Sequence, residues 1–199
     1  MKLIKSLALI LVVTTSLYAK EFIVNCNESN VRFSLVYQKE KAINGIFKDF
    51  DGLIIYDAEN KIESIKGFID ISSVETQNSF LNELIVSEKI LNAKKYSEME
   101  LYSTKIEDSK VYADLLINGA KRNVEFQLVN NGILLDKLYF TLSTTIFKDS
   151  FDLYWDVLSD LGSSVTSNEI KIEINIVADL KSEINFFYEK EKKTKKRKK

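Results

Sequence analysis

The residues that could carry out chemistry are few, and the most suggestive of them are pairs of carboxylates. The chain has no histidine and a single cysteine, which removes the commonest general base and leaves no plausible zinc or thiolate site. Asp49 with Asp51, and Asp149 with Asp152, have the side chains for a glycosidase-type dyad or a weak calcium site. Both pairs adjoin predicted turns, where acidic residues are ordinary. We therefore expect no catalytic residue, no metal and no cofactor.

The first 19 residues have the features of a secretory signal peptide. Lys2 and Lys5 precede a short apolar run, residues 7–13, and the small residue Ala19 ends the segment. The run is too short to span a bilayer comfortably as an anchor. We expect cleavage after Ala19 and export to the periplasm, and the alternative is an uncleaved amphipathic anchor.

Charge is divided unevenly along the chain. Between Lys20 and Glu191, 19 basic residues stand against 29 acidic ones, whereas the last eight residues hold seven basic side chains. An acidic body repels nucleic acid, which is therefore not an expected partner. The basic tail is either a solvated terminus or a contact with an anionic membrane. We divide the chain into a signal peptide (1–19), one folded domain (20–180) and a C-terminal extension with the basic tail (181–199).

Alternation of apolar and polar residues predicts strands along most of the folded domain. It is clearest after Val31, Val111 and Ile170, where every second residue is apolar, as in a strand with one buried face. Short strands with turns at regular intervals indicate an all-β sandwich or barrel. The turn at 130–132, with the sequence Asn-Asn-Gly, supplies the positive φ that a hairpin needs. Helical spacing within 79–92 predicts a short helical insertion that caps one barrel mouth.

The inward parity of these strands predicts a large apolar interior. The chain has 12 phenylalanines and 9 tyrosines, and an eight-stranded barrel holds either its own side chains alone or one elongated small ligand. Core packing and ligand lining remain alternative interpretations of each inward side chain. The residues expected to line the interior are Phe33, Leu35, Tyr37, Phe47, Ile69, Leu84, Leu101, Leu115, Ile117, Phe126, Phe140 and Ile172.

Five short segments, taken in order and spacing, resemble a known family. They are Ser29–Leu35, Asn44–Gly52, Ile69–Thr76, Leu115–Lys121 and Asn168–Ile174. Together they resemble the YceI-like periplasmic proteins between Phe22 and Ala178. The resemblance implies an all-β, lipocalin-like antiparallel barrel of about eight strands. It also implies binding of a long polyisoprenoid, such as a polyprenyl phosphate or a quinone tail, formation of a homodimer, and no catalysis.

The chain departs from that family at one barrel mouth. Leu81 and Leu84 stand in a stretch where relatives carry polar residues, and Lys148 stands where the family carries an arginine. We expect these leucines to make the mouth more apolar, which puts polar headgroup contacts seen in relatives in doubt.

Three hypotheses about function follow. The first is a periplasmic carrier that binds an isoprenoid lipid or another long apolar small molecule. The second is a structural or interaction protein whose barrel is filled by its own side chains and which acts through a dimer surface or its basic tail. The third is a carboxylate-dependent hydrolase, which would need perturbed acidities in a cleft. The size of the interior cavity separates the first two.

Overall fold

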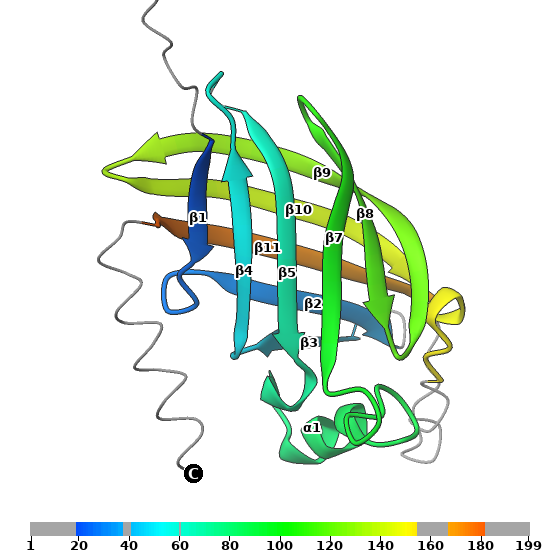
Figure 1. Cartoon of the computed structure of the whole chain (residues 1–199). Coiled ribbons are helices and arrows are strands. Elements are labelled where there is room, and N and C mark those ends of the chain that lie inside the picture. The colour runs from blue at the N-terminus through cyan, green and yellow to red at the C-terminus, as the bar shows by residue number, and fades with distance from the viewer. Residues whose placement is uncertain (1–18, 38–40, 60, 155–166, 182–199) are drawn as a thin grey trace, which may run out of the picture.

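Antiparallel β-strands form one sheet that closes on itself as a barrel (Figure 1). The computed structural model describes residues 19–37, 41–59, 61–154 and 167–181. The predicted signal peptide and most of the C-terminal extension therefore lie outside the described residues. The strands are β1 (Lys20–Val24), β2 (Asn30–Tyr37), β3 (Lys41–Phe47), β4 (Phe50–Tyr56), β5 (Ile62–Asp70), β6 (Val74–Thr76), β7 (Glu98–Glu107), β8 (Lys110–Ile117), β9 (Ala120–Leu134), β10 (Lys137–Phe147) and β11 (Glu169–Leu180).

Closure of the barrel depends on β11. The ring runs β1–β4–β5–β7–β8–β9–β10–β11 and returns to β1. β11 pairs with β10 along one edge, and its other edge pairs first with β2 and then with β1, where Phe22 lies opposite Leu180. β2, β3 and β6 extend the sheet beyond this ring. The structure therefore confirms the predicted antiparallel barrel of eight strands.

Two of the long strands are broken at the same level of the barrel. After β5, a single 3-10 turn (Ile71–Ser73) interrupts the ladder, and the carboxylate of Asp70 accepts a hydrogen bond from the amide of Ser72 at 2.8 Å. The break between β3 and β4 is bonded to the same turn, because the amide of Lys48 donates to the carbonyl of Ser73 at 3.2 Å. These local bonds link the two breaks, and β2, β3 and β6 continue the sheet from β11.

The predicted helical insertion is present, but the helix is shorter than the apolar spacing suggests. Helix α1 (Ser79–Val86) starts at the side-chain cap of Asn78 and stops at Ser87, whose ψ of 166° is extended. Ile90–Leu91 lie in the turns that follow, and both residues are buried. Their periodic spacing therefore reflects burial beneath the barrel rather than continuation of the helix.

The hairpin between β9 and β10 does not turn where the sequence predicts. Gly132 has a φ of 80°, but it lies within β9, where the register with β10 shifts between Tyr139 and Phe140. The chain reverses three residues later, at Leu135 and Asp136, which have φ values of 51° and 61°. The prediction of a turn at 130–132 was wrong because the positive φ of the glycine is used in a bulge.

Two glycines that face each other across β4 and β5 should differ in their tolerance of a side chain. A Cβ on Gly52 would lie 2.6 Å from the carbonyl oxygen of Lys66, whereas a Cβ on Gly67 would meet nothing closer than 3.9 Å. We expect Gly52→Ala to lower the free energy of unfolding by about 1–3 kcal/mol through overpacking. Gly67→Ala should raise it by about 0.4–1 kcal/mol through reduced chain entropy. Urea denaturation of both variants measures the difference, and equal destabilisation would contradict this account.

Candidate functional site: an apolar cavity in the barrel

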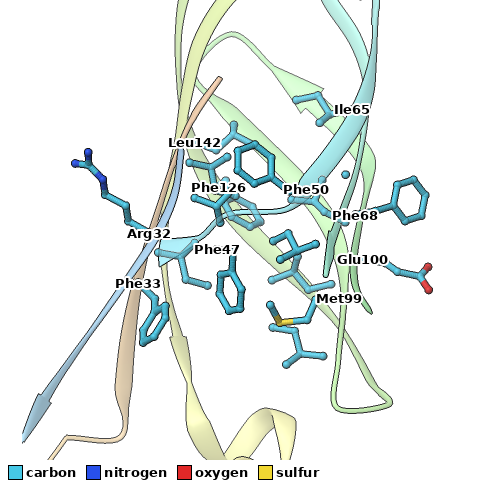
Figure 2. Close-up of a pocket in the computed structure, with 18 of the residues that line it drawn as sticks. Arg32, Phe33, Phe47, Phe50, Ile65, Phe68, Met99, Glu100, Phe126 and Leu142 are labelled. Atoms are coloured by element: carbon cyan, nitrogen blue, oxygen red, sulfur yellow. The ribbon is translucent and has the colours of Figure 1, made fainter. Parts of the chain in front are cut away.

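The barrel contains a partly open cavity of about 140 Å³ whose wall is almost entirely apolar. Side chains from β2, β3, β4, β5, β7 and β9 converge on it (Figure 2). Ile85 of α1 and Leu91 of the following turn also reach the wall, so the helical insertion closes one end of the barrel as predicted. An apolar space with so few polar groups on its wall favours an apolar guest over water.

Nine of the twelve predicted lining residues lie on the wall of this cavity. They are Phe33, Phe47, Ile69, Leu101, Leu115, Ile117, Phe126, Phe140 and Ile172. Leu35 is fully buried in the core but does not line the space, and Leu84 packs on the core from α1. The side chain of Tyr37 lies outside the described residues.

Several lining residues were not among the predicted ones. Phe50, Ile54, Ile65, Met99, Leu142 and Ile146 all contribute to the wall. Ile65, Met99, Leu142 and Ile146 share the inward parity of predicted residues on β5, β7 and β10, and Phe50 and Ile54 lie on the buried parity of β4, where no lining residue was predicted. The period-two alternation therefore contains the signal that would have found them.

The cavity exists partly because one inward position on its wall carries no side chain. Gly67 of β5 lies opposite Gly52 of β4 in the ladder and next to Leu101 of β7. Gly67 lies on the cavity wall. Since the nearest atoms to its missing Cβ are 3.9 Å away, a side chain at this position would extend into the free space.

Aromatic rings narrow the cavity on the side of β2 and β3. The rings of Phe33 and Phe47 have centroids 5.7 Å apart and are tilted by 41°. The ring of Phe33 lies over Gly45, and a Cβ on that glycine would lie 2.3 Å from the ring atom Cζ. Phe33, Ile172 and Ile174 line the cavity but are only half-buried. These three residues mark where the apolar lining meets solvent.

Charged groups near the cavity turn their side chains outward. Arg32 and Glu100 point away from the cavity in Figure 2. Glu100 instead accepts a hydrogen bond on the outer surface, which together with desolvation raises the pKa of Tyr102. Among the described residues, Tyr102, Lys105, Lys110, Asp114, Glu125 and Lys137 have shifted pKa values, and none of these six lines the cavity. The wall therefore provides apolar contact to a bound molecule rather than charge.

The carboxylate pairs do not form a buried site. Asp49, Asp51, Asp149 and Asp152 are all exposed. Within the described ranges, no cluster of three or more cysteine, aspartate or glutamate side chains could hold a metal ion. The same part of the chain contains no helix that is both long enough and apolar enough to cross a membrane.

A closed antiparallel barrel around an apolar space defines the class of small-molecule-binding barrels. The model of the YceI-like domain matches residues 22–178, so the chain belongs to the YceI-like family. A UPF0312 protein of Pseudomonas putida strain W619 is 27% identical over 146 residues, covering 67% of this chain and 72% of that protein. Protein YceI of Escherichia coli strain UMN026 is 28% identical over 109 residues, covering 51% of this chain and 57% of that protein.

Solved structures share the same barrel. BcnA of Burkholderia cenocepacia superposes with a TM-score of 0.69 at 20% identity, over 78% of this chain and 99% of that one. A polyisoprenoid binding domain from Saccharophagus degradans gives 0.69 at 13% identity, over 82% and 100%. The YceI protein of Campylobacter jejuni gives 0.61 at 23% identity, over 69% and 85%. At these sequence identities, the structural similarity establishes the fold alone.

Filling the space beside Gly67 should abolish binding of a small apolar guest. A dry apolar cavity of this size binds xenon or benzene, and a leucine at position 67 would occupy it. We expect Gly67→Leu to remove the xenon-induced shift in ¹²⁹Xe NMR. Val129→Leu, which enlarges an exposed apolar residue on β9, is the matched control and should retain the shift. An unchanged xenon signal in folded Gly67→Leu would show that the guest binds elsewhere.

Proposed function

We propose that this chain is a non-enzymatic binding protein that holds an elongated apolar molecule in its barrel, and that the ligand is a long-chain polyisoprenoid such as a polyprenyl phosphate or a quinone. The observation that carries the proposal is the apolar cavity inside the barrel. The YceI-like family and the likeness to a polyisoprenoid binding domain support the choice of ligand class. A carrier role follows from a ligand that is insoluble in water on its own.

The size of the cavity sets a condition on this proposal. About 140 Å³ is close to the volume of an engineered cavity that takes one benzene molecule, so a long chain has to displace side chains as it enters. Phe33 is the aromatic ring that moves at least cost, because it is half-buried and lies over a glycine. Each CH₂ of ligand that is then buried contributes about 0.8 kcal/mol, which offsets the rearrangement.

The small cavity also favours a second candidate function. Phe47, Phe50, Phe126 and Phe140 are all buried and fill much of the barrel. A barrel filled by its own side chains would serve as a structural or interaction protein, acting through a homodimer surface or the basic tail. This second function requires no ligand. An experiment that looks for a bound ligand therefore distinguishes it from the first.

Export to the periplasm is part of the same proposal. The basic start and short apolar run of residues 1–19 support a cleavable signal peptide. A periplasmic location would place the barrel beside membranes, from which it could take up an apolar lipid. Release of a chain that begins at Lys20, measured by mass spectrometry of the periplasmic fraction, tests this part.

Native mass spectrometry of protein purified from cells without detergent tests the ligand directly. We expect a bound species, and solvent extraction should release a molecule whose mass is that of a phosphate or quinone headgroup plus a whole number of isoprene units. Gly67→Leu should carry less of it, while Val129→Leu should match the parent chain. A bare mass that persists after incubation with polyprenyl phosphate and with a long-chain quinone would favour the self-filled barrel.

Removing the ring of Phe33 should speed the entry of a ligand. We expect Phe33→Ala to raise the association rate of the fluorescent apolar probe N-phenyl-1-naphthylamine, because the edge of the lining is then less obstructed. Phe147→Ala removes a half-exposed ring from the outer face of β10 and is the matched control. Stopped-flow fluorescence gives both rates, and equal rates in two folded variants would exclude Phe33 as an obstacle to entry.

A further inference from the structure

Among the described residues, Lys148 is the only buried one with a polar or charged side chain. It is 8% exposed and begins the 3-10 turn that follows β10, Lys148–Phe151. In the part of the chain that the structure describes, its ammonium group forms neither an ion pair nor a hydrogen bond. A buried charge without a partner destabilises the folded state. A cost of this kind is typical of a residue that serves binding rather than stability.

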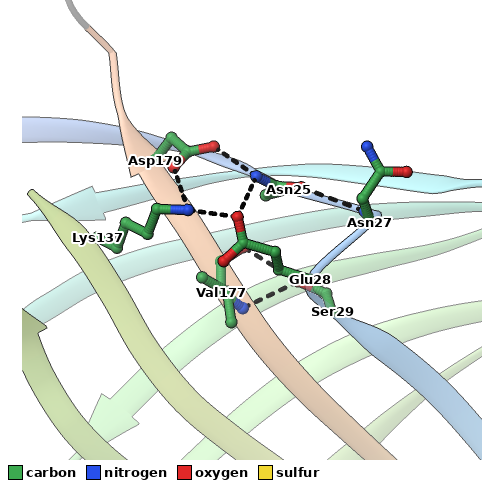
Figure 3. A network of polar contacts seen from close by, with 7 residues as sticks. All are labelled: Asn25, Asn27, Glu28, Ser29, Lys137, Val177 and Asp179. Carbon is green, nitrogen blue, oxygen red and sulfur yellow. Dashed lines mark hydrogen bonds and ion pairs between the residues drawn. The ribbon is translucent and has the colours of Figure 1, made fainter.

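Lys137, at the start of β10, shows the usual arrangement of a lysine in this molecule. Its ammonium group contacts the carboxylate of Glu28 and lies 3.4 Å from that of Asp179 (Figure 3). The side-chain amide of Asn25 donates to Asp179 at 2.8 Å and to Glu28 at 3.1 Å. The hydrogen bond with Glu28 is the main cause that raises the pKa of Lys137. The more exposed lysine is therefore paired, whereas the buried Lys148 is not.

Lys148 lies at the end of a row of inward positions on β10. Ile146, two residues earlier, is opposite Ile170 of β11, and both line the cavity. The backbone amide of Lys148 donates to the carbonyl of Asn168 at 2.8 Å, so Lys148 takes the next inward position after Ile146. It does not line the cavity of about 140 Å³ itself. A ligand longer than this cavity that extends past Ile146 would reach the ammonium group.

Hydrogen bonds fix the backbone on both sides of Lys148. The amide of Leu153, which lines the cavity, donates to the carbonyl of Lys148 at 3.2 Å. Asp149, the next residue, is exposed, and its carboxylate accepts a hydrogen bond from the side chain of Asn168 at 2.8 Å. The adjacent acidic side chain is thus held away from the ammonium group, and the lysine is positioned before any ligand binds. Such preorganisation is what a binding site requires.

We propose that Lys148 binds the acidic headgroup of the ligand, so that the barrel prefers an apolar chain ending in phosphate over one ending in an uncharged group. This inference rests on the proposed function, and it selects a polyprenyl phosphate over a quinone. A phosphate carried into place by its chain would pair with the ammonium group away from water, where a charge-assisted hydrogen bond is strong. The ligand would then supply the partner that the described residues do not.

Two ligands with the same chain separate recognition of the headgroup from binding of the chain. We expect the protein to bind farnesyl phosphate about tenfold more tightly than farnesol, because only the phosphate pairs with the lysine. Displacement of N-phenyl-1-naphthylamine measures both affinities. Equal affinities would overturn the headgroup assignment and leave the proposed apolar ligand standing, whereas binding of neither ligand would contradict both proposals.

Inorganic phosphate distinguishes a lipid headgroup from a free anion. It has no chain to bury, so isothermal titration calorimetry should detect far weaker binding than for farnesyl phosphate. Binding of inorganic phosphate as tight as that of farnesyl phosphate would make Lys148 a site for a free anion and would overturn the proposal.

Substitutions at Lys148 test the assignment to this residue. Lys148→Met should bind farnesol as the parent chain does and lose the preference for farnesyl phosphate. Its melting temperature without ligand should rise, because a buried unpaired charge is removed, whereas a structural role predicts a fall. Lys148→Arg retains the charge and should retain the preference. Lys171→Met removes an exposed lysine from β11 and is the matched control. A preference that persists in Lys148→Met, or that Lys171→Met abolishes equally, would overturn the proposal.

Discussion

Hydrogen bonding between the two ends of the folded domain is the interaction on which the rest of the structure depends. β11 bonds to β10 on one edge and to β2 and β1 on the other. This closure pairs strand edges that an open sheet would expose, and it directs the inward side chains of all ring strands toward one axis. The apolar cavity, its half-buried rim and the position of the β9–β10 turn all follow from it.

The interior balances close packing against free space. Phe47, Phe126 and Phe140 are buried and line the cavity, whereas Gly67 leaves one position on the wall without a side chain. A larger residue at Gly67 would take up free space, and a barrel without the phenylalanines would lose burial that stabilises the fold. The cavity is small because the side chains that stabilise the core and the space left for a ligand share the same interior.

Local alternation predicted the barrel and most of its lining, because inward residues repeat at every second position regardless of which strands pair. It could not predict the volume, since the free space beside Gly67 depends on the register of β5 with β4 and β7. The hairpin shows the same limit. Asn130 to Gly132 has ideal turn chemistry, yet the chain turns at Leu135, because inward parity across β10 and β11 sets the register. A shift by one residue would place Leu138 and Leu142 outside.

The pairing of Phe22 with Leu180 also constrains the order in which the molecule can form. These residues lie at opposite ends of the domain, and contacts between such distant segments are the slowest to be established. The hairpins of β7, β8, β9 and β10 join neighbours in sequence and can form while the chain is still growing. The ring itself cannot close until the 12 residues of β11 are available. Until then the apolar face of the sheet stays open, and it is at this stage that the chain most needs protection from aggregation.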